Sequence, residues 1–284
     1  MKPAPFEYFR PADFAEAIAQ LAEHGDGCKV LAGGQSLVPA MNFRLVRPAI
    51  LVDINDLDAL GSISADASRL SIGALTRHAA FHRPVVEGPL GLLLSQVARH
   101  IAHYPIRQRG TFGGSLAHAD PASEWCLVAT TLGAEMVATS TRGQRAIGSA
   151  AFFKGTFSTA LAADELLVDI RLPAMGPDWR FGFFEFSRRA GDYALGMALA
   201  AVQLSDGVVR DARLGIGAVA QRAIRLQDLE RQLIGERLSA SAIDAVARAA
   251  SASIQPTGDI HASPEYRRDL ITTAVKRALA EAGA

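Results

Sequence analysis

The hydrophobic pattern near the N-terminus alternates between helical and extended spacing. Apolar residues recur at helical intervals in residues 10–24, and residues 28–32 form an apolar extended run that leads into a glycine pair. Residues 37–45 can restart a helix, because the proline in that segment stands in its first turn, and residues 50–54 form the next extended run. This order predicts a small parallel α/β unit.

A second mixed region follows from about residue 57. A proline at position 105 is expected to force extended backbone at the preceding tyrosine, and a glycine-rich loop is expected in residues 109–115. The predicted strands are residues 70–75, 134–139 and 166–172, and the predicted helices are residues 89–103 and 121–132.

Residues 173–178 contain two prolines and a glycine, and we place a domain boundary there. Beyond it, loosely alternating residues 180–187, a turn at residues 205–207 and a strand at residues 208–219 predict a small antiparallel sheet. Two helices are expected to close the chain, the last of them starting at Ser263 with a proline in its first turn.

Length and charge narrow the class of protein. The 284 residues suffice for about two domains. Twenty-nine basic residues balance twenty-nine acidic ones, so nothing draws the whole chain toward nucleic acid or anionic lipid. The longest nearly apolar run, residues 194–204, is too short to cross a bilayer, and the N-terminus lacks the apolar stretch of a secretory signal. We therefore expect a globular cytoplasmic protein.

The two cysteines, Cys28 and Cys126, agree with a reducing compartment and limit metal chemistry. An iron–sulfur cluster usually takes four cysteines, and a structural zinc takes three or four closely spaced Cys or His ligands. We expect no metal site on this chain.

Glycine doublets occur in residues 32–36 (AGGQS) and 111–115 (TFGGS), each between an extended segment and an expected helix start. Without Cβ atoms, such loops let backbone N–H groups approach a phosphate, and a following helix adds free donors. Ser36, Thr111 and Ser115 add hydroxyl groups. Two such loops are suited to grip a pyrophosphate, whereas either one alone is more readily a tight turn.

Residues 32–37 and 111–121 resemble the two flavin-binding signatures of the FAD-binding medium subunit of the molybdenum hydroxylases. Carbon monoxide dehydrogenase, xanthine dehydrogenase and bacterial N-heterocycle hydroxylases belong to that family. The resemblance covers nearly the whole chain, since further matching segments follow in the expected order and spacing. These segments are residues 6–11, 107–110, 165–173 and 191–194.

The resemblance implies an α+β fold with a two-lobed FAD-binding region and a small C-terminal domain. The N-terminal α/β lobe would span residues 1–56 and the second lobe residues 57–174. The C-terminal domain, a three-stranded antiparallel sheet with helices, would span residues 178–284.

The resemblance also implies which residues bind FAD. Two segments would wrap its pyrophosphate and ribityl part. They are Leu31, Ala32, Gly33, Gly34, Gln35, Ser36 and Leu37 in the first, and Thr111, Phe112, Gly113, Gly114 and Ser115 in the second.

Four further positions would contact the cofactor. Ile101 would pack near the flavin ring, and the backbone of Leu167 would contact the ring's polar edge. Glu124 would hydrogen-bond the adenosine end, or else serve only as a first-turn acid of its helix. Tyr193 would cover the isoalloxazine and gate it, the alternative being a buried tyrosine of a sheet. No residue of this chain is expected to act as a catalytic acid or base.

Three positions depart from the family pattern. Ser115 stands where many members have Asn, and Glu124 replaces a frequent Asp. Glu185 stands where some members carry Lys near the flavin, so it receives no role and the flavin potential stays open.

Competing signals in the sequence are weaker. Residues 215–220 match G-x-G-x-x-A after a strand, but no convincing helix follows. His100 and His103 share an expected helix face without a third ligand, and His118 lies near serines without a G-x-S-x-G elbow.

The predicted function is that of an oxidoreductase subunit that passes electrons from [2Fe-2S] clusters of a partner through FAD to an external acceptor. The resemblance implies a small iron–sulfur subunit and a large molybdopterin subunit, in a dimer of heterotrimers. Two alternatives stay open. One is a stand-alone FAD-dependent oxidase or reductase acting on an organic donor, and the other is an assembly module whose glycine loops are only turns.

Overall fold

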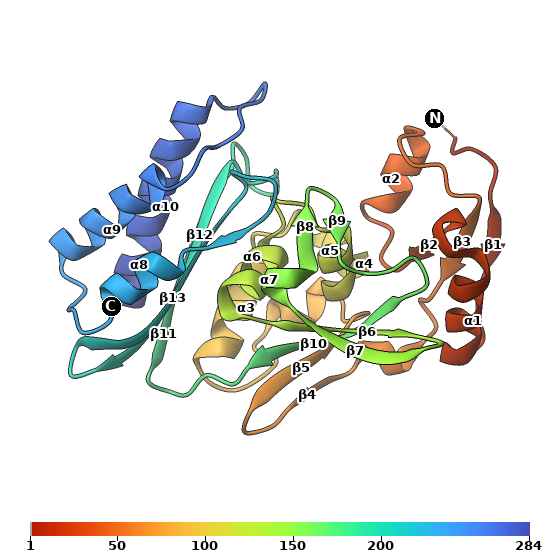
Figure 1. The fold of residues 1–284 in the computed structure, drawn as a ribbon, viewed down its shortest axis with the longest axis horizontal. Coiled ribbons are helices and arrows are strands. Elements are labelled where there is room, and N and C mark those ends of the chain that lie inside the picture. The colour runs from red at the N-terminus through yellow and green to blue at the C-terminus, as the bar shows by residue number, and fades with distance from the viewer. Residues whose placement is uncertain (1) are drawn as a thin grey trace.

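Three larger sheets organise the chain, one in each of three consecutive regions, in the computed structural model, which describes residues 2–284. From right to left in Figure 1 they belong to the N-terminal lobe, the second lobe and the C-terminal domain. No helix within residues 2–284 is long and apolar enough to cross a membrane.

The N-terminal lobe is built on a parallel sheet. Its strands are β1 (Glu7–Phe9), β3 (Ile50–Asp53) and β2 (Cys28–Leu31), in that spatial order. Helix α1 (Phe14–His24) contributes Ala17, Ile18 and Leu21 to the core of this lobe, and the short helix α2 (Leu37–Asn42) follows β2. The predicted parallel α/β unit is therefore confirmed, with β1 as an additional strand.

The second lobe contains a five-stranded sheet in which every neighbouring pair is antiparallel, in the order β4-β5-β10-β6-β7. A separate two-stranded sheet pairs β8 with β9. The strands are β4 (Ile63–Ala65), β5 (Arg69–Gly73), β6 (Glu135–Ser140), β7 (Gly143–Gly148), β8 (Phe153–Gly155), β9 (Ser158–Thr159) and β10 (Leu166–Pro173). The helices are α3 (Pro89–Ala98), α4 (Tyr104–Arg109), α5 (Phe112–His118), α6 (Glu124–Leu132) and α7 (Ser149–Phe152).

Three local expectations for this lobe are wrong. The helix expected over residues 89–103 ends at Ala98, and Tyr104 with Pro105 begins α4 instead of forming extended backbone. Pro105 stands in the first turn of α4, where its missing N–H costs little, and the extended residue is the preceding His103. The second glycine doublet lies in the first turn of α5 and not in a loop.

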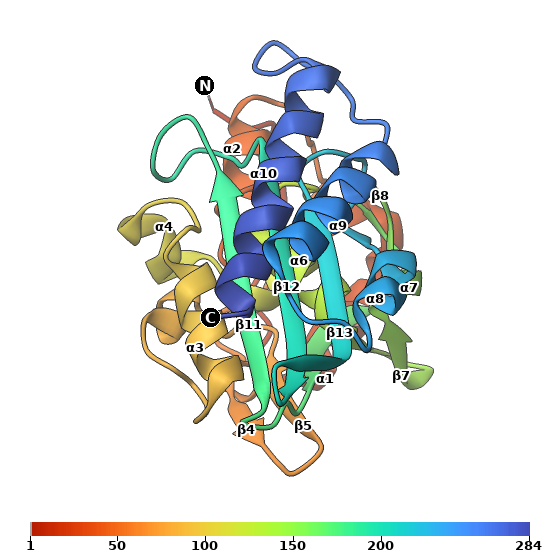
Figure 2. The ribbon, with the colours of Figure 1, turned by 90° about the vertical axis from the view of Figure 1, so that its left-hand side faces the viewer.

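The C-terminal domain packs helices on one face of an antiparallel sheet (Figure 2). Its strands are β11 (Trp179–Phe186), β12 (Gly196–Ser205), β13 (Val208–Gly217) and β14 (Ile224–Arg225). The sheet therefore has four strands and not the expected three, because the two-residue β14 pairs with the end of β13. Its helices are α8 (Gln227–Leu233), α9 (Ala240–Ala252) and α10 (Pro264–Ala282). The predicted start of the last helix is confirmed, because the Ser263 side chain accepts the N–H of Tyr266.

Helix α6 lies between the second lobe and the C-terminal sheet, where it contacts β12 and β13. Every residue from Trp125 to Leu132 is buried, since both faces of the helix are covered. The second lobe and the C-terminal domain thus share a packed interface on either side of α6.

Candidate cofactor site

The first glycine loop follows β2 and offers a run of free backbone donors. The N–H groups of Gly33, Gly34, Gln35 and Ser36 meet no acceptor within residues 2–284. Gly34 has a φ of 73°, a left-handed conformation that glycine adopts without strain. The following α2 has only six residues, so its helix dipole is small. The capacity of this loop to bind an anion therefore rests on the free main-chain N–H groups. Successive free N–H groups of this kind suit a ligand with anionic oxygens.

The second glycine segment has no such free donors within its helix start. All four N–H groups of residues 112–115 bond inside the chain, two of them to the carbonyl oxygens of Thr76 and Ala74 and two to Thr111. The Thr111 side chain is the N-cap, accepting from the Gly114 N–H at 3.0 Å. A phosphate between the segments would therefore take main-chain donors from the first loop and hydroxyl groups from the second.

The two predicted segments lie against each other. A Cβ atom on Gly33 would overlap the carbonyl oxygen of Arg109 and stand 2.7 Å from the Cα of Gly110. A Cβ on Gly114 would stand 3.8 Å from the Cβ of Ala32. The glycines allow the two lobes to approach closely at this point.

Two residues that the sequence analysis missed join the segments. Asn55 follows β3 and donates from Nδ2 to the carbonyl oxygen of Ala32 at 2.8 Å. Arg77 follows β5 and donates from Nη2 to Asn55 Oδ1 at 2.7 Å and from Nη1 to the carbonyl oxygen of Arg109. One available signal was the position of Asn55 just past a parallel strand, the edge at which α/β sheets bind ligands.

Tyr193 lies in the loop between β11 and β12, and 72% of its surface is exposed. The alternative of a buried sheet tyrosine is therefore wrong. In the same loop, a Cβ on Gly191 would stand 3.1 Å from the carbonyl oxygen of Ala102, so the loop packs beside the buried Ile101. Partial burial of the Tyr193 hydroxyl, with the carboxyl groups of Asp120 and Glu124 nearby, raises its pKa.

Two acidic side chains occupy the interface between the second lobe and the C-terminal domain. Glu124 is the first residue of α6, and burial raises the pKa of its carboxyl. The side chain of Glu185, on β11, is 2% exposed, and its Oε2 has no hydrogen-bond partner within residues 2–284. Burial, with Glu124 nearby, raises the pKa of Glu185, and His100 Nδ1 is 3.9 Å from Glu185 Oε2.

Besides the buried Ile101, two of the predicted site residues have apolar side chains inside the core. The Phe112 ring packs against Phe81 and Trp125, at centroid distances of 5.5 and 4.7 Å. Leu167 is a buried residue of β10. Any contact these two make with a ligand would come from their main chain.

The G-x-G-x-x-A interpretation of residues 215–220 is wrong. The chain turns at Ala218, which has a φ of 66°, and continues into β14 and not into a helix. Gly215 and Gly217 instead let β13 pack closely against the side chains of Thr131 and Met197. Among residues 2–284 there is no group of three or more His, Cys, Asp or Glu side chains suited to a metal ion.

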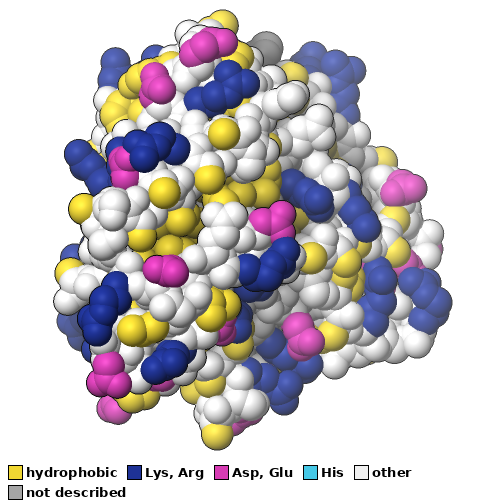
Figure 3. Space-filling view, turned by 60° about the vertical axis from the view of Figure 1, so that its left-hand side comes forward, with side chains coloured by type: hydrophobic (Ala, Val, Ile, Leu, Met, Phe, Trp, Pro, Cys, Tyr) yellow, Lys and Arg dark blue, Asp and Glu magenta, His cyan; other side chains and the backbone are white. Residues whose placement is uncertain are grey.

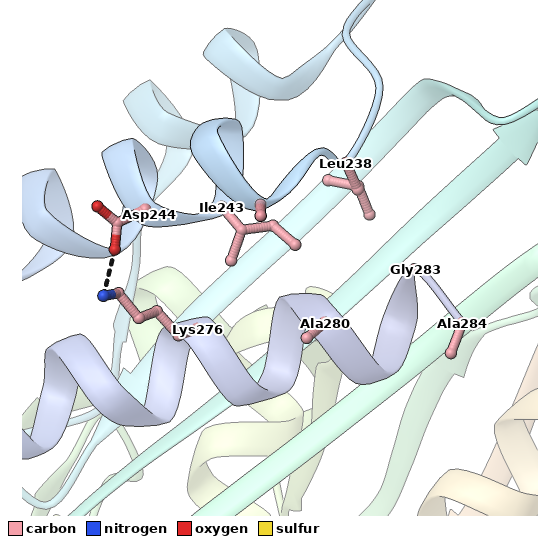
Figure 4. Close-up of a pocket in the computed structure, with 8 residues that line it drawn as sticks. Leu238, Ile243, Asp244, Lys276, Ala280, Gly283 and Ala284 are labelled. Atoms are coloured by element: carbon pink, nitrogen blue, oxygen red, sulfur yellow. Dashed lines mark ion pairs between the residues drawn. The ribbon is translucent and has the colours of Figure 1, made fainter.

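One surface cavity lies away from the glycine segments, in the C-terminal domain. This cavity has a volume of about 390 Å³, and its lining between α9 and α10 is mostly apolar. Figure 4 shows the ion pair in the lining, Asp244 with Lys276. On the face drawn in Figure 3, acidic and basic side chains are interspersed, with hydrophobic ones between them. That mixture agrees with the zero net charge and forms no large region of one sign.

Comparison with known proteins matches both parts of the chain to family models. Residues 4–175 match the FAD binding domain in molybdopterin dehydrogenase, and residues 182–282 match the CO dehydrogenase flavoprotein C-terminal domain. The 6-hydroxypseudooxynicotine dehydrogenase complex subunit alpha of Paenarthrobacter nicotinovorans is 41% identical, over 99% of this chain and 96% of that protein.

Solved structures agree with these matches over the full length. A chain of carbon monoxide dehydrogenase from Hydrogenophaga pseudoflava superposes with a TM-score of 0.95 at 34% identity, covering 99% of this chain and 98% of that one. A chain of quinoline 2-oxidoreductase from Pseudomonas putida 86 gives a TM-score of 0.92 at 37% identity, covering 100% and 98%.

Proposed function

Because the chain belongs to the FAD-binding medium subunits of the molybdenum hydroxylases, we propose that it carries electrons between a partner's [2Fe-2S] clusters and an external acceptor by way of FAD. The observation that carries the proposal is the run of free N–H groups at residues 33–36, held against the second glycine segment. This arrangement fits the diphosphate of FAD, which brings anionic oxygens and no donors.

The chain's own residues would bind and orient the cofactor. The first loop would hold the diphosphate with its N–H groups, and Thr111 and Ser115 would add hydroxyl groups from the other side. Ile101, Glu124, Leu167 and Tyr193 would line the rest of the site, as the resemblance implies. Bound FAD would supply a centre able to take up electrons singly or in pairs, so no side chain need act as acid or base.

The partners in this proposal are a small iron–sulfur subunit and a large molybdopterin subunit, assembled as a dimer of heterotrimers in the cytoplasm. The two cysteines support this division of labour, because both are buried and they are too few for a cluster. A relative whose name makes it the medium chain of carbon monoxide dehydrogenase, from Hydrogenophaga pseudoflava, is 33% identical over 98% of this chain.

An absorption spectrum of the purified full chain tests the cofactor. We expect flavin bands and release of one FAD per chain on denaturation. A colourless chain that binds no added FAD would favour the assembly module and overturn the proposal.

Isolation of the chain from its native host tests the electron route. We expect two further chains to copurify and the flavin to be reduced only when both are present with their substrate. Turnover of an organic donor by the chain alone would favour the stand-alone oxidase or reductase instead.

A further inference from the structure

A hydrogen-bonded pair of side chains spans the junction between the two glycine segments. Asn55 belongs to the N-terminal lobe and Arg77 to the second lobe, and Nη2 of Arg77 donates to Oδ1 of Asn55 at 2.7 Å. Neither residue lies in a glycine segment. The pair therefore connects the lobes through side chains and not through the segments themselves.

The two ends of the pair hold the two carbonyl groups that flank the contact between the segments. Asn55 Nδ2 donates to the carbonyl oxygen of Ala32, the residue before Gly33, at 2.8 Å. Arg77 Nη1 donates to the carbonyl oxygen of Arg109, the atom against which Gly33 packs. The same pair thus fixes the entrance of the first loop and the surface that this loop rests on.

The side chain of Asn55 is itself fixed in place. Asp53 Oδ1 accepts from the backbone N–H of Asn55 at 3.0 Å and from its Nδ2 at 2.5 Å, and Tyr8 donates its hydroxyl to Asp53 Oδ2 at 2.5 Å. With acceptors on the nitrogen side and a guanidinium on the oxygen side, the network defines the orientation of the amide. Such a connected polar network favours one geometry of the loop over others.

Arg77 also brings a positive charge that belongs to no ion pair within residues 2–284. Its guanidinium is half-buried and bonds to two neutral oxygens, and no carboxylate within residues 2–284 forms an ion pair with it. Desolvation and the neighbouring Arg109 lower its pKa, the Asp53 carboxylate partly opposes them, and a guanidinium stays protonated in proteins. An anion near the first loop would gain from this charge.

We propose that Asn55 and Arg77 are positioning residues for the diphosphate of FAD, acting by locking the first glycine loop against the second segment. The proposal rests on the proposed function. The pair would hold the loop so that the free N–H groups of residues 33–36 point toward one anion. The positive charge of Arg77 would add to the attraction for that anion.

Two single variants and their combination test this in the full chain. Arg77→Lys keeps the charge but cannot bond to Asn55 and Arg109 as a planar fork. Asn55→Ala removes the bond to Ala32 and leaves the charge of Arg77 in place. We expect each variant to weaken FAD binding by roughly tenfold or more, measured by quenching of FAD fluorescence. The double variant should be little weaker than the worse single one, because the two side chains act as a unit.

Two further readouts separate positioning from general stability. ADP carries the diphosphate without the flavin, so its own dissociation constant should rise in each variant by a factor similar to that for FAD. Hydrogen exchange at residues 33–36 should slow on FAD binding in the native chain and slow less in the variants, while the melting temperature without FAD changes little for Arg77→Lys. Arg142→Lys, at the surface ion pair with Asp164, is the matched control and should bind FAD normally.

The outcomes distinguish the two proposals. A native chain that binds no FAD overturns the proposed function together with this inference. FAD and ADP affinities within twofold of native in both variants overturn this inference alone. Should Asn55→Ala fail to fold, the conservative Arg77→Lys decides by itself.

Discussion

The Cα atom of Gly110 lies 2.7 Å from the position that a Cβ on Gly33 would occupy, and the carbonyl oxygen of Arg109 lies closer still. Both are backbone atoms, so not even the methyl group of alanine fits at position 33 unless the two lobes move apart. The glycine is thus required by the contact between the lobes.

Gly33→Ala should separate the two segments and lose FAD, at a cost of about 1–3 kcal/mol in stability from overpacking. Gly34→Ala is the matched control. Its added methyl would meet side-chain atoms of Leu31 and Val38 at 3.2 Å, so its cost is mainly the left-handed backbone, about 1 kcal/mol. FAD content and urea unfolding of both variants check this. Equal FAD retention by the two would contradict it.

Thr111→Val should destabilise the chain by about 1 kcal/mol, because the N-cap acceptor of the Gly114 N–H is lost while the side-chain volume is kept. Thr111→Ser retains the oxygen and should be close to native. The urea midpoints of the two variants provide the measurement. A valine variant as stable as the serine variant would show that the cap contributes nothing.

Local patterns were enough to predict the elements whose boundaries are set by neighbouring residues. The start of α10 at Pro264 after Ser263 and the turn before Val208 depend only on such neighbours. The order of the second sheet does not, because β10 pairs with β5 and β6, strands far from it in sequence. Periodicity carries no information about which distant strands pair.

The candidate site also contains features that local sequence predicts and features that only tertiary folding sets. Its glycine doublets could be recognised as a pair, and the structure brings them into contact. That the N–H of Gly113 is used by Ala74 could not be predicted, because Ala74 reaches it only through tertiary folding. The hydrogen-bonded pair of Asn55 and Arg77 could not be predicted either, because neither residue belongs to a motif and only tertiary folding brings them together.

Tyr193→Ala tests the proposed gate over the flavin. A side chain that is 72% exposed contributes little packing, so the free energy of unfolding should change by no more than the roughly 0.5 kcal/mol typical of surface substitutions. As the ring is uncovered, iodide should quench the flavin fluorescence more strongly, and external acceptors should reoxidise the flavin faster. Tyr193→Phe, which keeps the ring, should behave as the native chain does. Unchanged rates for every acceptor in Tyr193→Ala would remove the gate.

Glu185→Gln should make the stability of the chain less dependent on pH. Burial raises the pKa of Glu185 in the folded state, so above the ordinary glutamate pKa of about 4.3 the folded chain holds a proton that the unfolded chain releases. Stability therefore falls as pH rises, by about 1.4 kcal/mol per pH unit while the difference is one proton.

A neutral amide removes that contribution. The free energy of unfolding of Glu185→Gln should therefore rise relative to that of the native chain from about pH 5 to about pH 8, measured by urea unfolding at both values. Glu124, also with a raised pKa, remains and keeps part of the slope. Glu135→Gln, at an exposed position of β6, is the control and should follow the native profile. A Glu185→Gln variant whose stability falls as steeply as that of the native chain would mean that the Glu185 carboxyl is ionised inside the fold.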